Sequence, residues 1–159
     1  MYESNLAGEK LEKTVNNIYG EIHVHDNAVS QAIPNGAVYT KLDVWSDNGE
    51  AKLTTPDYVN GEITVSETGI YKIEASLSFK SGTSNIVSSC SIFINDVEQD
   101  QAHFIRKISV AGDVGSASVT ALGSITAGDK VDIRMLHDDP SPVDITIVYG
   151  NLNVELATL

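Results

Sequence analysis

Hydrophobic and polar residues alternate along most of this chain with a period of two. The alternation is clearest in residues 71–79, where apolar side chains fill the odd positions and polar side chains fill the even ones. A half-buried β-strand produces this pattern because successive side chains point to opposite faces of a sheet. The pattern predicts about nine or ten strands, in segments that include 21–25, 37–45, 61–65, 70–79, 86–94, 102–110, 116–125, 131–136 and 143–156.

Turn-forming residues separate these segments. Clusters of Asp, Asn, Gly, Ser and Pro occur at 47–49, 67–69, 81–85, 95–96, 112–113, 128–129 and 138–142. No helical pattern follows residue 19, and neither a shift in composition nor an internal repeat divides residues 20–159. Short strands joined by such turns favour an all-β domain of antiparallel strands, built as a sandwich or a closed barrel.

Residues 1–19 differ from the rest of the chain. They mix Glu with Lys and space the apolar residues Leu6, Leu11, Val15 and Ile18 three to five positions apart. This spacing is compatible with a short amphipathic helix, which is marginal in water without a partner. Two interpretations stay open: a tail that orders against a partner through these four residues, or a disordered end. The predicted organisation is a tail at 1–19 and one β domain at 20–159.

Composition and charge exclude several classes of function. The chain has 159 residues and a net charge of −12 at pH 7, which repels phosphate backbones and anionic membrane surfaces. The single Cys90 excludes an internal disulfide. No apolar run approaches the roughly 20 residues that a membrane helix needs, and the first residues lack the features of a secretory signal. We therefore expect synthesis in a cytoplasm, with any surface location reached through assembly.

Several segments occur in the order known from one family, namely Gly69–Ile73, Ile92–Asp96, Ala127–Ile133 and Tyr149–Leu152. Together they resemble the C1q/tumour-necrosis-factor-like jelly roll over about residues 60–157. The chain departs from the animal members because it has no collagen-like Gly-x-y stretch. Its Tyr149-Gly150 pair also stands where an aromatic-x-Gly spacing is usual.

A closer resemblance is to the C1q-like domains of bacteriophage structural proteins. It is carried by Tyr19–Val24, Ile33–Leu42, Asn48-Gly49, Gly61–Val65 and Gly69–Tyr71. The resemblance implies an antiparallel jelly-roll β-sandwich, a homotrimer and a non-enzymatic role on a virion.

Two short segments are apolar at successive positions, which a strand with one wet face would not be. They contain Ile92, Phe93, Ile94, Ile147, Val148 and Tyr149. One interpretation is that the core covers one face of each segment and a neighbouring subunit covers the other. These six residues are then candidates for the trimer interface. The alternative is that both segments lie deep inside a monomeric sandwich.

Candidate metal ligands occur in two places. His23 and His25 share one face of a strand, so a third ligand from Asp26 or another subunit would complete a site. Asp138 and Asp139 offer the oxygen ligands that Ca²⁺ prefers. The alternatives are exposed polar histidines and a stiff acidic turn, and no cofactor is required by the sequence.

Motifs of catalysis are missing from the sequence. It contains no G-x-S-x-G, no P-loop and no dinucleotide-binding fingerprint, and Cys90 falls within an apolar strand where an inert thiol is expected. We therefore expect a protein that is not an enzyme. Trp45 and Tyr58 flank predicted loops and are candidates for stacking on a sugar, although Trp45 at a strand end also suits the core.

The first hypothesis for function is a bacteriophage virion protein. It would be a head fibre or capsid-decoration knob at the virion surface, attached to capsid or another virion protein by residues 1–19. The second hypothesis is a receptor-binding fibre tip that recognises host-surface glycans. The third is a bacterial C1q-like surface or spore-coat protein.

Overall fold

The computed structural model describes residues 17–36 and 38–158, and in these ranges the chain forms twelve β-strands. No helix in these ranges is long and apolar enough to cross a membrane. The strands are β1 (Tyr19–Val24), β2 (Gln31–Ile33), β3 (Thr40–Lys41), β4 (Asp47–Lys52), β5 (Thr54–Asp57), β6 (Glu62–Val65), β7 (Gly69–Ser81), β8 (Ile86–Ile94), β9 (Val97–Ile108), β10 (Val114–Ile125), β11 (Lys130–His137) and β12 (Val143–Thr158).

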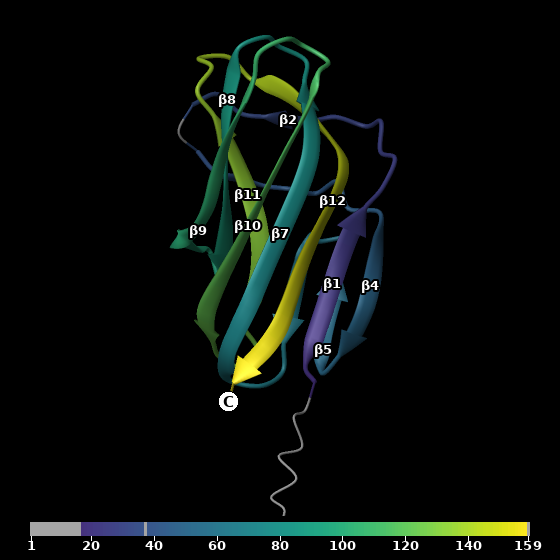
Figure 1. Cartoon of the computed structure of the whole chain (residues 1–159), viewed down its shortest axis with the longest axis vertical. Helices are drawn as coiled ribbons and strands as arrows, with labels where there is room; N and C mark the ends of the chain where they lie inside the picture. The colour runs from purple at the N-terminus through teal and green to yellow at the C-terminus, as the bar shows by residue number, and fades with distance from the viewer. Residues whose placement is uncertain (1–16, 37, 159) are drawn as a thin grey trace, which may run out of the picture.

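The strands form two antiparallel sheets packed face to face. Sheet A has the order β10-β7-β12-β1-β4, and β2 pairs with the first three residues of β12. Sheet B has the order β5-β6-β11-β8-β9, and β3 pairs with β11. Apart from the hairpins β5–β6 and β8–β9, the neighbours within each sheet come from distant parts of the sequence, as in a jelly roll (Figure 1). The predicted all-β antiparallel jelly-roll sandwich is confirmed.

The core lies between the sheets and is built from the inward positions of each strand. Along β7 the residues Tyr71, Ile73, Ala75, Leu77 and Phe79 are all buried, as the alternation predicts. The Tyr71 hydroxyl donates a hydrogen bond to the Glu67 carbonyl oxygen at 2.8 Å, so its polar end is satisfied. Each large apolar side chain buried in this way contributes about 1.5–3 kcal/mol to folding.

Residues 34–46 do not form the long strand predicted for 37–45. Among the described residues of this segment, β3 is the only strand, and it pairs with β11 at the edge of sheet B. We call residues 34–46 the strap. Leu42 and Trp45 from this segment belong to the core instead. The predicted turn at 47–49 is also wrong, because this segment begins β4, which is held in a ladder with β1.

A β-bulge explains the successive apolar residues of β12. The register against β7 shifts between Ile147 and Tyr149, so Val148 is the extra residue. Odd-numbered residues point inward before the bulge, and even-numbered residues such as Leu152 and Val154 point inward after it. The change of side inside one strand therefore places Tyr149 on the outer face of sheet A.

The boundary between tail and domain lies before Ile18, not after residue 19. The Ile18 side chain is 0% exposed in the core, and its carbonyl oxygen accepts a hydrogen bond from the Leu156 amide at 2.8 Å. Ile18 has the same inward parity as Ile22 and Val24 on β1. It is therefore a core residue, and its assignment as a tail anchor is wrong. The other anchor candidates, Leu6, Leu11 and Val15, lie outside the described residues.

Candidate self-association surface

The outer face of sheet A carries an area without charged side chains. Two of its strands run through long stretches that contain no Asp, Glu, Lys or Arg, at residues 114–128 and 145–154. We call the outward residues at the centre of this area the hydroxyl face. They are Ser76 and Ser78 of β7, Ser116 and Ser118 of β10, and Tyr149 and Asn151 of β12.

Cross-strand pairing brings these short polar side chains together. Ser76 stands opposite both Ser118 and Asn151 in the ladder, and Ser78 stands opposite Ser116. The Ser76 hydroxyl donates to the Asn151 side-chain oxygen at 2.5 Å, and the hydroxyls of Ser78 and Ser116 are 2.7 Å apart. The hydroxyl groups therefore satisfy part of their hydrogen-bonding capacity within the sheet, and these bonds hold the side chains close to the sheet surface.

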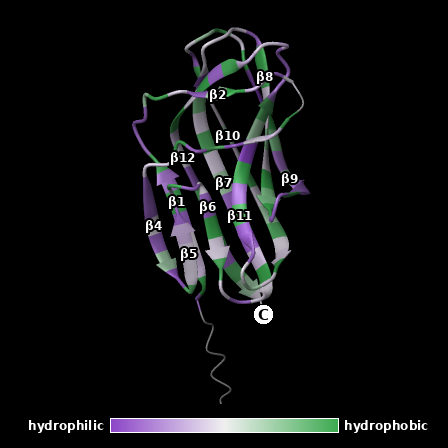
Figure 2. Cartoon of the chain, turned by 180° about the vertical axis from the view of Figure 1, so that it is seen from behind, coloured by the Kyte–Doolittle hydropathy of each residue, from purple (hydrophilic) through white to green (hydrophobic). Residues whose placement is uncertain are grey.

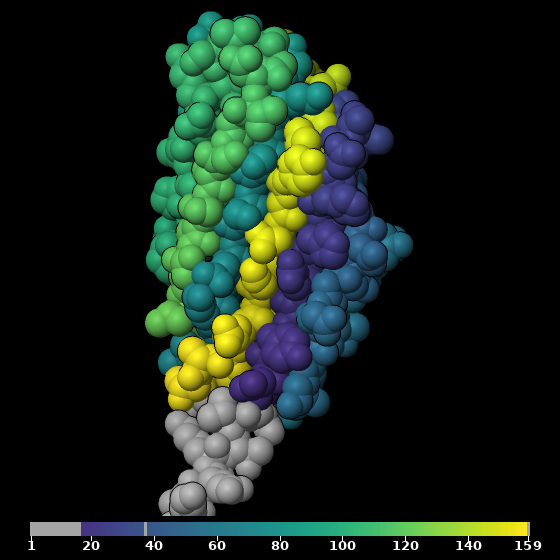
Figure 3. All heavy atoms as spheres, turned by 45° about the vertical axis from the view of Figure 1, so that its right-hand side comes forward, coloured from purple at the N-terminus to yellow at the C-terminus, as the bar shows by residue number. Residues whose placement is uncertain are grey.

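Short side chains leave a shallow hollow on this face. It measures about 570 Å³ and is lined by the hydroxyl face together with parts of Val24, Leu77, Ala117 and Gly150. Tyr149 has the largest side chain of the group. It is 52% exposed and lines the hollow. Figure 3 shows this side of the molecule, with β12 in yellow between β7 in teal and β1 in purple.

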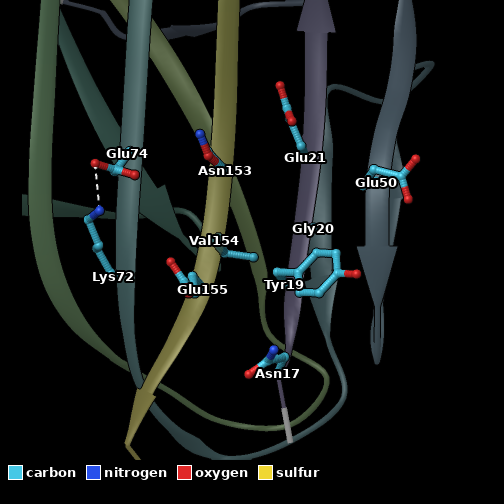
Figure 4. Close-up of a pocket in the computed structure, with 10 residues that line it drawn as sticks. All are labelled: Asn17, Tyr19, Gly20, Glu21, Glu50, Lys72, Glu74, Asn153, Val154 and Glu155. Atoms are coloured by element: carbon cyan, nitrogen blue, oxygen red, sulfur yellow. Dashed lines mark ion pairs between the residues drawn. The ribbon is translucent and has the colours of Figure 1, made fainter.

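The same face becomes acidic toward the end where β1 begins and β12 ends. A second hollow of about 340 Å³ is lined there by four carboxylates, from Glu21, Glu50, Glu74 and Glu155 (Figure 4). Lys72 pairs with Glu74 at 2.9 Å and is the one cation among the lining residues. The outer face of sheet A thus has an uncharged area at its centre and an acidic area toward this end.

An uncharged area on a chain of net charge −12 is suited to contact with another protein surface. Charged residues are depleted at the centre of protein interfaces, because each buried charge loses its hydration. Two copies of this chain repel each other least where neither presents a charge. Hydroxyl, amide and phenol groups at this position supply hydrogen bonds but no charged acid or base.

The outer face of sheet B has the opposite character. A group of charged side chains lies on it around β11, and Figure 2 shows this side, with the hydrophilic part of β11 in purple. We call this group the strap cluster because it joins the strap to sheet B. Its members are Lys41, Glu62, Asp96, Lys130, Asp132 and Arg134.

Lys41 connects the strap to two strands of sheet B. Its Nζ atom lies 2.8 Å from a Glu62 carboxylate oxygen and 3.4 Å from an Asp132 carboxylate oxygen. Lys130 approaches the second oxygen of Glu62 at 2.5 Å. Burial alone would raise the pKa of Glu62, but hydrogen bonds from Lys130 and Lys41 outweigh it, so the pKa lies below its ordinary value.

Arg134 holds the centre of the strap cluster. Its guanidinium group donates to both oxygens of Asp132, at 2.7 and 2.9 Å, and also pairs with Asp96. The same group lies 4.3 Å from the centre of the Phe93 ring, and the Tyr39 ring of the strap packs edge-on against Phe93. Burial, together with a hydrogen bond to Glu98, raises the pKa of Tyr39 to about 12.

The six predicted interface residues divide between four environments. Ile92, Ile94 and Ile147 point into the core of their own chain, so they do not face a neighbour. Phe93 does point outward, but from sheet B, where the strap and Arg134 cover it. Val148 is the bulge residue, and Tyr149 is the one candidate of the six that lies on the hydroxyl face. The prediction that both faces of residues 92–94 are buried is correct, but the strap provides the second cover.

The predicted sugar contact of Trp45 is wrong. Trp45 is 6% exposed, and its indole nitrogen donates to the Leu42 carbonyl oxygen at 2.9 Å inside the chain. Gly61 packs against the indole ring, which leaves no face for a sugar. Tyr58 is partly exposed on the loop before Gly61.

The structure places the predicted metal ligands in separate surroundings. The rings of His23 and His25 have centres 6.2 Å apart. Asp138 accepts a hydrogen bond from the Val87 amide, and Asp139 accepts one from the Ser141 amide. Across residues 17–36 and 38–158, no three His, Cys, Asp or Glu side chains form a group that would hold a metal ion. Cys90 is buried, and burial raises the pKa of its thiol well above the usual range.

Comparison with known proteins places the fold. No family model and no curated protein sequence matches the chain. Among solved structures, the Eiger TNF of S. frugiperda matches with a TM-score of 0.58 and 15% identity, over 89% of this chain and 95% of that one. The globular domain of the zebrafish complement 1qA protein matches with the same score and identity, over 88% and 97%. This chain has the TNF/C1q fold.

The hydroxyl face was not predicted from the sequence, apart from Tyr149. Its serines alternate with core residues and look like the ordinary wet face of a strand. A signal does exist, because the absence of charge over residues 114–128 is unusual in a chain this acidic. The sequence does not show that this stretch and residues 145–154 flank the same strand, which the pairing of both with β7 establishes.

Proposed function

We propose that this chain is a non-enzymatic structural protein of a bacteriophage virion that assembles as a homotrimer through the outer face of sheet A. It would form a knob such as a head fibre or a capsid decoration. The observation that carries self-association is the hydroxyl face, an uncharged area on a chain of net charge −12. The virion role is supported by the sequence resemblance to phage C1q-like domains.

The two faces of the sandwich favour sheet A as the contact. On sheet B the charged groups are already paired within the chain, so burying them against a neighbour would cost desolvation with little gain. On sheet A the hydroxyl face carries no such cost, and Tyr149 offers an exposed aromatic side chain of the kind enriched at interfaces.

The experiment is the mass in solution by light scattering, combined with a charge placed on each sheet. Ser118→Lys puts a cation on the hydroxyl face, and like charges brought together in the assembly cost about 2 kcal/mol or more. Ser89→Lys is the matched control, because Ser89 is an outward serine on β8 in the middle of sheet B. We expect a mass of three chains for the parent and for Ser89→Lys, and a shift to the single chain for Ser118→Lys.

A single-chain mass for the parent protein would refute the self-association. A shift caused by Ser89→Lys and not by Ser118→Lys would move the contact to sheet B. The fluorescence of the single, buried Trp45 shows whether each variant is folded.

Attachment to a virion is tested separately. We expect the full chain to be recovered with purified phage particles, and a chain lacking residues 1–16 to be lost from them. The deletion stops before Ile18 because that residue belongs to the core. Unchanged recovery of the shortened chain would refute the anchoring role of the tail, and absence of the full chain from particles would refute the virion role.

A further inference from the structure

The chain contains three Asn-Gly pairs, at 35–36, 48–49 and 60–61. An asparagine followed by glycine can lose its side-chain amide in water, because the glycine nitrogen reaches the side-chain carbon without obstruction from a Cβ atom. This reaction needs a side chain that is free to move onto the backbone of the next residue. The three asparagines differ in how far hydrogen bonds restrict the side chain.

Two of the three asparagine side chains are fixed by hydrogen bonds. The Asn48 side-chain oxygen accepts a bond from the Tyr58 amide at 2.9 Å, and Asn48 also lies in β4, paired with Ile22 of β1. The Asn60 side-chain nitrogen donates to Asp57 at 2.6 Å, and the Asn60 backbone amide donates to the same carboxylate. Reaction at either residue requires these bonds to break first.

Asn35 has no such restraint. It lies on the exposed part of the strap between β2 and β3, and its side chain has no hydrogen-bond partner among the described residues. Gly36 follows with a φ of 38°, in the left-handed region where an L side chain is disfavoured. A bond from the Gly36 amide to the Asp139 carbonyl oxygen, 3.3 Å long, connects this turn to the acidic loop after β11.

We propose that Asn35 is a modification site, where spontaneous deamidation changes the charge and the backbone of the strap. The Gly36 nitrogen attacks the side-chain carbon of Asn35, its proton passes to solvent, and ammonia leaves to give a cyclic imide. Water then opens the imide at one of its two carbonyls, which yields either aspartate or isoaspartate at position 35. No other reactant is needed, and no redox change occurs.

The surroundings of Asn35 give the reaction a structural consequence. Either product places a negative charge beside the loop that carries Asp138 and Asp139. Isoaspartate also adds a methylene to the backbone just before the Gly36–Asp139 hydrogen bond. The buried His137 connects that loop to the end of β2. Its ring forms one hydrogen bond with the Ile33 carbonyl oxygen at 2.9 Å and accepts another from the Asp139 amide at 3.2 Å. The modification therefore loosens the strap from this end of the sandwich.

The experiment follows all three sites in one digest of the full chain. Cleavage after lysine separates them, because residues 14–41, 42–52 and 53–72 form three different peptides. The folded chain is incubated in warm, mildly alkaline buffer, and mass spectrometry measures amide-to-acid conversion at each asparagine over time. At Asn35 only the 3.3 Å bond of the attacking Gly36 amide must break, whereas each of the other two sites must also release a hydrogen bond of the asparagine side chain. We therefore expect Asn35 to convert at least about tenfold faster.

The chain unfolded in urea provides the control for intrinsic reactivity. There all three sites are expected to convert at rates within about threefold of one another, because local structure no longer protects any of them. A folded-state advantage of less than about tenfold for Asn35, or an equal advantage in urea, would overturn the proposal. Asn35→Gln should abolish conversion in peptide 14–41 and leave the other two peptides unchanged. Conversion that persists there would place the site at a different asparagine.

Discussion

Asp132 is the residue on which the strap cluster depends, and its replacement by asparagine tests the role of that cluster. Asp132 is 2% exposed and accepts two hydrogen bonds from Arg134, at 2.7 and 2.9 Å, while the Lys41 ammonium lies 3.4 Å away. The substitution Asp132→Asn would keep the shape of the side chain. The new amide nitrogen would face a guanidinium donor, so one of the two bonds would become a contact between two donors.

The expected loss follows from burial and from the partners that remain. Removing one member of a buried ion pair typically costs about 3–5 kcal/mol. Lys41 keeps Glu62 and Arg134 keeps Asp96, so neither cation is left without a counter-charge. We therefore expect Asp132→Asn to lower the free energy of unfolding by about 2–3 kcal/mol, less than a full buried pair.

The matched control is Glu74→Gln on the outer face of sheet A. It makes the same change of acid to amide in the Lys72–Glu74 pair, where both side chains are well exposed. An exposed pair contributes about 0–1 kcal/mol, so the control should lose less than about 0.5 kcal/mol. Urea unfolding followed by Trp45 fluorescence measures both variants, at one chain concentration because self-association adds to apparent stability.

A local measurement separates the strap from global stability. Lys41 is the single site for trypsin in residues 34–46, so cleavage of the native protein after Lys41 reports release of the strap. We expect faster cleavage there in Asp132→Asn than in Glu74→Gln. A loss below about 1 kcal/mol for Asp132→Asn, or cleavage no faster than in the control, would refute the idea that the cluster holds the strap.

Two further predictions use the same unfolding assay. Ile18→Ala should lower the free energy of unfolding by about 2–4 kcal/mol because it leaves a cavity at a fully buried position. The control Val29→Ala, at an exposed loop, should lower it by less than about 0.5 kcal/mol. Equal losses would contradict the assignment of Ile18 to the core. The pKa of Glu62 is lowered by folding, so its stabilisation is present above the ordinary value of 4.5 and disappears as the pH falls through the lower, folded value. Glu62→Gln should therefore lose less stability than the parent between neutral and acidic pH, and an unchanged pH dependence would contradict that role.

For the outward side chains of sheet A, the sequence predicts which way each one points, but only the topology shows which of them are neighbours. The alternation along β7 correctly predicts that Ser76 and Ser78 point away from the core. It does not predict that β10 and β12 are the neighbours of β7, because antiparallel partners here are separated by tens of residues. The hydroxyl face exists only once those three strands are side by side.

The strap and the bulge account for the main errors. Residues 37–45 alternate like a strand, but sheet B offers this segment only two ladder positions, and Tyr39 covers Phe93 instead. The apolar run at 147–149 comes from a register shift in β12, which a fixed period of two does not represent. The spacing of Ile18 from Val15 suits a helix and therefore favours the tail, although the parity of Ile18 with Ile22 also suits β1.

The sequence by itself determined that this protein is an all-β domain of antiparallel strands, which segments form most of those strands, and that its surface is strongly acidic. These properties follow from local side-chain alternation and from composition, which need no knowledge of which strands pair. The tertiary structure decided which part of the surface carries no charge, which segment covers Phe93, and at which residue the domain begins. Those properties depend on contacts between residues far apart in the chain, and strand order and register alone bring such residues together.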